Sequence, residues 1–261
     1  MPEPTAGPVS ERFHPNRVIG AHVITYAEVD STMNVASVRA EAGSPHGTVI
    51  RAHAQRTGRG RFGRRWESAV GDSLLTSTVL RMPPLAIGAN MAIAATLAVR
   101  DTVSHLTGAE CAIKWPNDVH VYGRKIAGVL VEASLDTAGN GVAIVGIGLN
   151  VNLDPSNFPT IAEAATSLAL EAGHAISADL VEVTLFAKLE AAIRQIAEDP
   201  QAALGAWRAA LDTLGRQVTV QTRTGSLAGI AEDVDEKGNL LLRTPDSNLH
   251  TLAEGDVSLR G

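Results

Sequence analysis

The chain has 261 residues, of which 45% are hydrophobic and 19% are charged. This composition is typical of a soluble globular protein, and the length allows one large domain or a medium domain with a smaller one. The formal net charge of −6 argues against a general nucleic-acid binder, whose binding surface is usually basic. The single cysteine, Cys111, excludes an internal disulfide and a metal site built from several thiolates.

The N-terminal sequence MPEPTAGPVSERFHPN has no apolar core, so it does not resemble a signal peptide. We predict that residues 1–25 form a partly disordered leader. The uncharged stretch over residues 82–99 is rich in alanine and contains two prolines, which favours a helix packed in the core over a membrane span. These features predict a cytoplasmic protein.

Periodicity and turn residues predict helices and strands over residues 26–214. Asp30 and Ser31 can cap a helix over 32–41 that stops at Gly43. Other predicted helices cover 85–106, 177–197 and 202–214. Predicted strands cover 48–55, 73–80, 111–115, 119–122, 126–132 and 142–151.

Beyond Gly215 the pattern changes to short strands separated by turn residues. They cover 217–223, 227–233, 240–243, 249–253 and 257–259, which predicts a small β-barrel. We place the boundary near Leu214, so that residues 26–214 form a first domain and residues 215–261 a second.

The segment QRTGRGRFGRRW, residues 55–66, carries five arginines among three glycines. Gly58, Gly60 and Gly63 satisfy G-x-G-x-x-G, but a dinucleotide-binding turn needs a helix at the last glycine, and a strand is predicted next. Guanidinium groups on a glycine-rich backbone suit a loop that closes over a phosphate or carboxylate. A solvated basic loop or a nucleic-acid contact is the alternative.

Two further segments carry polar side chains at strand ends. In KWPND (114–118) with GRKIAGVLVE (123–132), Asn117 has donors and an acceptor that can read an adenine edge. Lys125 begins a strand, and Gly128 leaves room for a ligand. In GIGLNVN (146–152), Asn150 offers a second amide. The alternative for the first segment is an ordinary hairpin with surface lysines. The eight histidines are scattered without metal-site spacing, so none is given a role.

Together these segments resemble the biotin protein ligases. DSTM, GRGRFGRRW, KWPND with GRKIAG, and GIGLNVN occur in the order found in that family, and LGRQV and GDVSLR are similar to its C-terminal part. The resemblance implies an α+β fold, with a mixed β-sheet flanked by helices as in class II aminoacyl-tRNA synthetases, and a small SH3-like β-barrel. It implies that ATP activates biotin as biotinyl-5′-AMP. The biotin then passes to a lysine of a biotin carboxyl carrier protein, as in acetyl-CoA carboxylase or another biotin-dependent carboxylase.

The resemblance also implies roles for individual residues. The biotin pocket would be lined by Ser31, Thr32, Gln55, Gly58, Arg59, Arg61, Lys125 and Gly128. The nucleotide would contact Arg61, Arg64, Trp66, Asn117 and Asn150. Catalysis would depend on Lys125, Arg61, Arg64 and Asp118, where Asp118 orients the acceptor amine or helps to hold Mg²⁺.

Two alternatives stay open at this point. A lipoate or octanoate ligase shares the general fold but lacks an arginine loop of this type. A nucleic-acid-binding regulator would use that loop and the barrel, and the acidic composition counts against it. Because the resemblance starts near Tyr26, no winged helix is expected before it, and we predict no DNA binding and no membrane partner. A homodimer is compatible with the resemblance.

Overall fold

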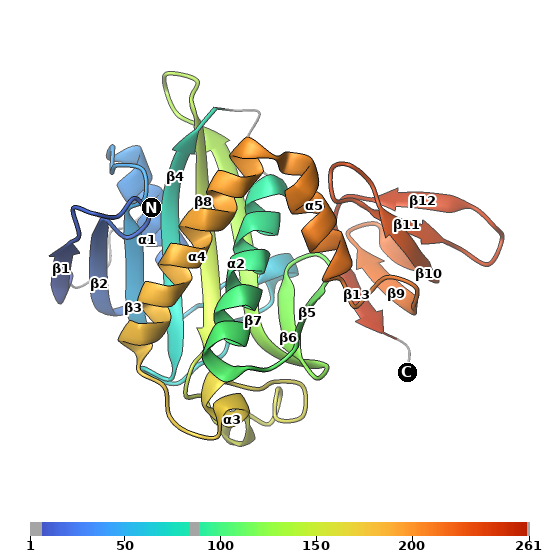
Figure 1. The fold of residues 1–261 in the computed structure, drawn as a ribbon, viewed down its shortest axis with the longest axis horizontal. Coiled ribbons are helices and arrows are strands. Elements are labelled where there is room, and N and C mark those ends of the chain that lie inside the picture. Colours follow the sequence, from blue (N-terminus) through green and yellow to red (C-terminus); the bar gives the residue numbers. More distant parts are fainter. Residues whose placement is uncertain (1–6, 84–88, 260–261) are drawn as a thin grey trace.

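An eight-stranded mixed sheet forms the centre of the computed structural model, which describes residues 7–83 and 89–259 (Figure 1). The strand order is β1-β2-β3-β4-β8-β7-β6-β5, and every neighbouring pair is antiparallel except β2 and β3. The strands are β1 (Ser10–Phe13), β2 (His22–Val29), β3 (Val49–Gln55), β4 (Ser73–Met82), β5 (Cys111–Lys114), β6 (Asp118–Val121), β7 (Arg124–Leu135) and β8 (Gly141–Asn150).

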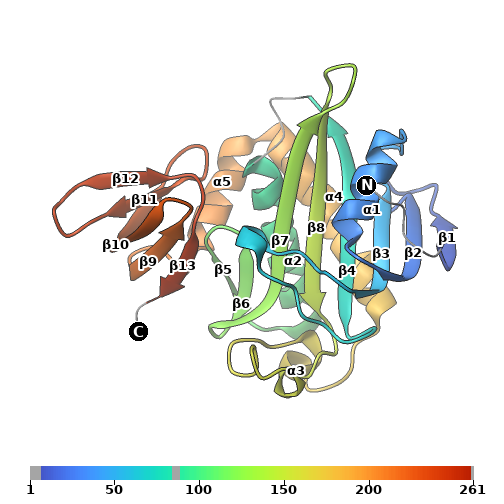
Figure 2. The same cartoon turned by 180° about the vertical axis from the view of Figure 1, so that it is seen from behind.

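Helices cover both faces of this sheet. They are α1 (Thr32–Glu41), α2 (Ala89–Thr107), α3 (Leu168–Ala172), α4 (Ala178–Glu198) and α5 (Pro200–Ala209). Figure 1 shows α2 and α4 lying across one face, and Figure 2 shows α1 and the chain between β3 and β4 on the other. Side chains alternate between faces along a strand. Val119 and Val121 of β6 therefore point into the main core with α2, and His120 between them points to the α1 face.

The C-terminal strands form a second, five-stranded antiparallel sheet, with the order β12-β11-β10-β9-β13. They are β9 (Gln217–Thr222), β10 (Gly225–Val234), β11 (Leu240–Arg243), β12 (Leu249–Leu252) and β13 (Asp256–Leu259), which confirms the five predicted strands. Val218 and Leu242 belong to the same apolar cluster as Trp115 and Trp207. The indole Nε1 of Trp115 donates to the carbonyl of Gly238 at 3.0 Å. The two sheets thus share one hydrophobic core.

The expected leader over residues 1–25 is wrong from Ser10 onward. Strand β1 pairs with β2, and β2 begins at His22 and pairs in parallel with β3. Val23, Ile24 and Tyr26 are almost completely buried, so this segment belongs to the core of the sheet. Burial of such β-branched and aromatic side chains stabilises the strand and opposes disorder.

Other differences are shifts at the ends of helices and strands, such as β7, predicted over 126–132 and found over Arg124–Leu135, and one short helix. The predicted helix over 202–214 ends at Ala209, because the next residues form hydrogen bonds with β5 instead. The Ile113 N–H donates to the Ala210 carbonyl at 2.8 Å, and the Asp212 N–H donates to the Ile113 carbonyl at 3.0 Å. Helix α3 was not predicted, although Ser167 caps it and Gly173 ends it in the left-handed region. The predicted helix over 85–106 starts within residues 84–88, which lie outside the described residues. Within the described residues, α2 runs from Ala89 to Thr107.

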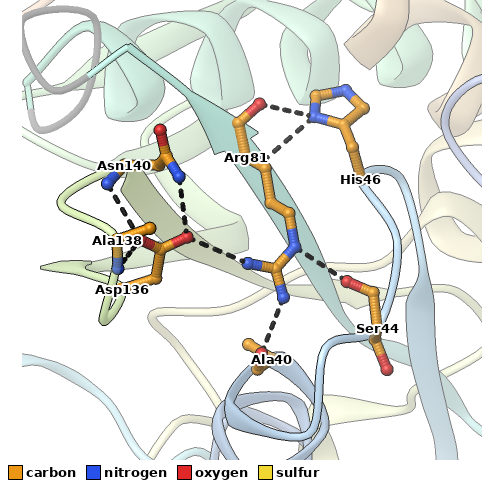
Figure 3. A network of polar contacts seen from close by, with 7 residues as sticks. All are labelled: Ala40, Ser44, His46, Arg81, Asp136, Ala138 and Asn140. Atoms are coloured by element: carbon orange, nitrogen blue, oxygen red, sulfur yellow. Dashed lines mark hydrogen bonds and ion pairs between the residues drawn. The ribbon is translucent and has the colours of Figure 1, made fainter.

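Arg81 forms a network of polar contacts at the C-terminal end of β4 (Figure 3). The Arg81 guanidinium donates to the carbonyls of Ala40 (2.6 Å) and Ser44 (2.9 Å), and lies 3.8 Å from the Asp136 carboxylate. Asp136 also accepts bonds from Ala138 and Asn140, which fixes the β7–β8 turn. This network connects the end of α1, β4 and the β7–β8 turn, and it lies far from the polar motifs.

Candidate active site

A cavity of about 480 Å³ opens on the α1 face of the large sheet. It is lined by all the predicted site residues except one: Ser31, Thr32, Gln55, Arg59, Arg61, Arg64, Trp66, Asn117, Asp118, Lys125, Gly128 and Asn150. The exception, Gly58, lies within the arginine loop against the backbone of its last residue, where an added Cβ would meet the Trp66 carbonyl at 2.9 Å. The fold therefore brings together segments that are up to 119 positions apart, from Ser31 to Asn150.

Strand register places polar residues and bare backbone in one row across the sheet. Lys114 on β5 faces Asp118 on β6, which faces Gly128 on β7, which in turn faces Gly148 on β8. Cross-strand partners share a face of the sheet. The charged side chains of Lys114 and Asp118 therefore lie beside two glycines, Gly128 and Gly148. Because glycine has no side chain, another group can approach the backbone closely there.

The indole of Trp66 lies over this glycine pair. A Cβ on Gly148 would lie 2.6 Å from Trp66 Cε2, and one on Gly128 would lie 3.1 Å from Cζ3. The room expected beside Gly128 is thus filled by an aromatic ring. Within the described part of the chain, Trp66 Nε1 is buried without a hydrogen-bond partner. The adenine contact predicted for Trp66 stays a prediction.

Lys125 and Asp118 form the charged centre of the cavity. The Lys125 ammonium lies 2.8 Å from an Asp118 carboxylate oxygen and 5.5 Å from the centre of the Trp66 ring. These two contacts fix the position of the Lys125 ammonium, because an ammonium is attracted to a carboxylate and to the face of an indole. The structure thus provides a preorganised cation at the edge of the glycine patch.

Protein groups compensate the charge of the arginine loop. The acceptors come from three other segments and from the loop itself: Asp30 and Glu28 for Arg56, Glu132 for Arg59, the Gly255 carbonyl for Arg61, Asp256 for Arg64, and the Arg56 carbonyl for Arg65. The loop contains only the short 3₁₀ turn η1 (Arg61–Gly63) before β4 begins, which confirms that it is not a dinucleotide-binding turn. It lies between the large sheet and β13, because Arg59 pairs with Glu132 of β7 and Arg64 pairs with Asp256.

Arg61 is the only one of the five loop arginines that is partly buried, and the other four are exposed. Burial lowers the pKa of its guanidinium, and the nearby Glu254, Asp118 and Asp256 act in the opposite direction. An arginine stays charged under such a shift. A half-buried cation that donates only to a carbonyl at 3.1 Å and to the Asn117 amide oxygen at 3.4 Å has capacity for a stronger anionic partner.

The residues predicted at the far end of the biotin pocket form a small hydrogen-bond network. The backbone N–H and hydroxyl of Thr32 donate to the Gln55 amide oxygen at 2.7 and 3.1 Å, and Ser77 donates to the Thr32 hydroxyl at 2.8 Å. The expected side-chain cap by Ser31 is wrong, since its hydroxyl makes no cap bond. That hydroxyl is buried without a partner among the described residues, so it is available to a ligand.

Both predicted adenine-reading amides are engaged with the protein backbone. The Asn117 amide donates to the Val129 carbonyl at 2.6 Å, and the Asn150 amide donates to the Thr166 carbonyl at 2.9 Å. These bonds fix the turn after β5 and the end of β8. Their nucleotide contacts stay predictions.

Sequence reasoning gave no role to several lining residues, among them His120. It lies two positions after Asp118 on the same face of β6 and pairs in register with Lys125. Strand alternation after the KWPND segment is the signal that could have identified it, because Asp118 and His120 share a face while the valines between and after them enter the core.

The sequence and the fold of this chain are similar to those of known proteins. Residues 26–152 match the model of the biotin/lipoate A/B protein ligase family, and residues 213–260 match the biotin protein ligase C-terminal domain. A biotin–[acetyl-CoA-carboxylase] ligase of Mycobacterium tuberculosis is 34% identical over 263 residues, which cover 96% of this chain and 95% of the relative. This chain belongs to the biotin protein ligase family.

Two other similarities agree with this assignment. A biotin–[acetyl-CoA-carboxylase] ligase of Paracoccus denitrificans is 33% identical over 229 residues, covering 84% of this chain and 93% of the relative. The solved structure of an Aquifex aeolicus biotin protein ligase in complex with biotin and ATP has a TM-score of 0.76 and 28% identity, covering 91% of this chain and 98% of that one. The predicted fold class and family are therefore confirmed. None of the described helices is long and apolar enough to cross a membrane.

Proposed function

We propose that this biotin protein ligase uses ATP to convert biotin to biotinyl-5′-AMP and then transfers the biotin to a lysine of a carrier protein. The observation that carries the proposal is the ion pair of Lys125 and Asp118 at the edge of the bare Gly128–Gly148 patch, with Arg61 on the loop opposite. The family comparisons favour biotin as the activated acid. No specific observation favours a lipoate or octanoate ligase, or a nucleic-acid-binding regulator.

In the first step, the biotin carboxylate attacks the α-phosphorus of ATP and pyrophosphate leaves. Two anionic groups must approach within bonding distance, so fixed cations stabilise the transition state. Lys125 and Arg61 are the cations that the cavity holds in place by a carboxylate, an aromatic ring and the Gly255 carbonyl. Arg64, now paired with Asp256, would exchange that carboxylate for phosphate as the loop closes.

In the second step, the acceptor lysine attacks the biotinyl carbonyl and AMP leaves. The attacking amine must first lose a proton. Asp118 is the carboxylate of the charged centre and is paired with Lys125, so the same ion pair would orient the incoming amine and stabilise the departing phosphate. The loop over the cavity would keep water from the mixed anhydride. Ser31, Thr32, Gln55 and Arg59 would bind the ring end of biotin, and Gly58, which does not line the cavity, would act only by shaping the loop.

Magnesium is proposed as part of the ATP substrate. Among the residues described, no group of three or more His, Cys, Asp or Glu side chains is arranged to hold a metal ion. The Asp118 oxygen already lies 2.8 Å from an ammonium. Mg²⁺ commonly binds through substrate phosphates and one or two carboxylates. Asp118 is the residue that would supply such a carboxylate, and a chelator should stop adenylate formation without changing the melting temperature.

The acceptor is proposed to be a biotin carboxyl carrier protein, or the equivalent domain of acetyl-CoA carboxylase or another biotin-dependent carboxylase. We propose the cytoplasm as the location, because the reaction consumes ATP. The lack of DNA binding and the formation of a homodimer stay predictions, and fluorescence anisotropy with DNA and sedimentation analysis would test them.

Adenylate formation tests the proposed activity before any carrier is identified. Incubation with biotin and α-labelled ATP should give labelled biotinyl-5′-AMP and one pyrophosphate per adenylate. Lipoate and octanoate at the same concentration should give little product. Equal or greater product from lipoate would contradict biotin as the substrate, and its absence with every acid would contradict acid activation.

A further inference from the structure

His120 is a buried side chain in the wall of the cavity to which the sequence assigned no role. It is 7% exposed, and it lies on the α1 face of β6 because Val119 and Val121 point into the core on the other face. Neither ring nitrogen makes a hydrogen bond of good geometry among the described residues, although the Gly123 backbone is close enough to affect the pKa of the ring. An imidazole normally has a donor or acceptor at each nitrogen, and leaving both unpaired away from water is costly. Such a group calls for a ligand or a fixed water as its partner.

The charges around His120 indicate the class of ligand. Lys125 is its cross-strand partner, Asp118 is two positions before it, and Lys114 faces Asp118. Asp118 is paired with Lys125, whereas Lys114 makes no ion pair within 4 Å among the described residues. Burial raises the pKa of the Asp212 carboxyl group and the charge of Lys114 lowers it, but Asp212 does not line the cavity. This part of the cavity therefore has an excess of positive charge and attracts an anion.

The ring of His120 is neutral. Burial lowers its pKa to about 4; Lys114 and Lys125 act in the same direction, while Asp118 and the Gly123 backbone oppose them. A neutral imidazole carries one N–H donor and one acceptor. Beside two lysines, the donor can bond to an anionic oxygen that the ammonium groups neutralise.

We propose that His120 binds the triphosphate of ATP, donating one hydrogen bond to an oxygen of the part that leaves as pyrophosphate. This inference rests on the proposed assignment of the cavity to biotin and ATP, and it adds a residue to the phosphate end of that site. The alternative is a core histidine whose nitrogens are satisfied by trapped water and which has no contact with substrate.

Replacement by leucine separates these two readings. His120→Leu removes both nitrogens and keeps an apolar side chain of similar bulk, so the melting temperature should stay equal or rise. A lost hydrogen bond to a charged oxygen should raise KM for ATP about tenfold or more. The inhibition constant of inorganic pyrophosphate should rise in parallel, while the Kd for biotin in the absence of ATP should not change.

Conservative variants and a surface control complete the test. His120→Asn and His120→Gln each keep one nitrogen near its original place, and one of them should recover most of the ATP affinity. His105→Leu, on the exposed side of α2, should match the parent in every assay. If His120→Leu keeps the parental KM for ATP and pyrophosphate inhibition while the parent is active, the inference is wrong. If the parent forms no adenylate, the proposed function fails together with it.

Discussion

Replacing Lys125 with alanine removes the cation at the centre of the charged row. Its ammonium is held 2.8 Å from Asp118 and 5.5 Å from the Trp66 ring centre, so it needs no reorganisation when negative charge moves onto the phosphoryl oxygens. Loss of one such preorganised group costs about 10²–10³ in rate, or about 3–4 kcal/mol of transition-state stabilisation. The rate of biotinyl-5′-AMP formation should fall by that factor.

The fold should be nearly unaffected by the same change. The Lys125 side chain is 35% exposed, and ion pairs of this exposure contribute about 0–1 kcal/mol to the free energy of unfolding. Lys125→Arg should recover only part of the rate, since a planar guanidinium does not replace a point charge. Lys114→Ala should have a smaller effect on the chemical step. Single-turnover assays with saturating biotin and ATP measure the step directly, and a parental rate in Lys125→Ala would refute the assigned role.

Three further outcomes are expected. Gly148→Ala should displace the Trp66 indole, which lies where the new Cβ would be only 2.6 Å from Cε2, and should weaken biotin binding about tenfold by titration. Asp256→Ala should free the Arg64 side of the arginine loop and increase tryptic cleavage there, and biotin with ATP should slow that cleavage. The free energy of unfolding should fall as pH decreases from about 6.5 to about 4, because the unfolded chain then protonates His120 while the folded chain does not. The loss is at most about 3 kcal/mol from this group, and it should be absent in His120→Leu.

Matched variants control for general effects of these changes. Gly205→Ala adds a methyl group to helix α5 in open space, so it should leave biotin binding unchanged. Asp246→Ala removes an exposed carboxylate far from the loop in sequence, so it should not alter cleavage between Arg56 and Arg65. Unchanged biotin affinity in Gly148→Ala, equal cleavage rates in Asp256→Ala, or the same pH dependence in His120→Leu would each contradict the corresponding contact.

Sequence patterns were sufficient where local chemistry determines the structure. Alternating apolar residues predicted most strands of both sheets, and Gly43 and Gly108 predicted where α1 and α2 end. The arginine loop and the KWPND turn indicated the site because these residue types have few structural uses in such density. The HVITY run at the start of β2 carried a similar signal, and only its position beside an apparent leader obscured it.

The remaining features depend on strand register and on distant partners. Gly128 and Gly148 become one bare patch only because β7 and β8 pair at these positions, and nothing local predicts that Trp66 covers them. The acceptors of the loop arginines lie as far away as Asp256. His120 was missed because a single histidine in an apolar strand is not distinctive by itself. Alternation from Asp118 places it on the cavity face, but its importance arises from the lysines that the register places around it.

The central claim is most directly tested by transfer of labelled biotin to a carrier domain. With ATP and Mg²⁺, the chain should attach one biotin to the acceptor lysine, and a carrier with that lysine replaced by arginine should remain unlabelled. Lys125→Ala should label the parental carrier at a rate lower by about two to three orders of magnitude. No labelling of any biotin carboxyl carrier protein by a folded, biotin-binding chain, or labelling that does not require ATP, would contradict the account.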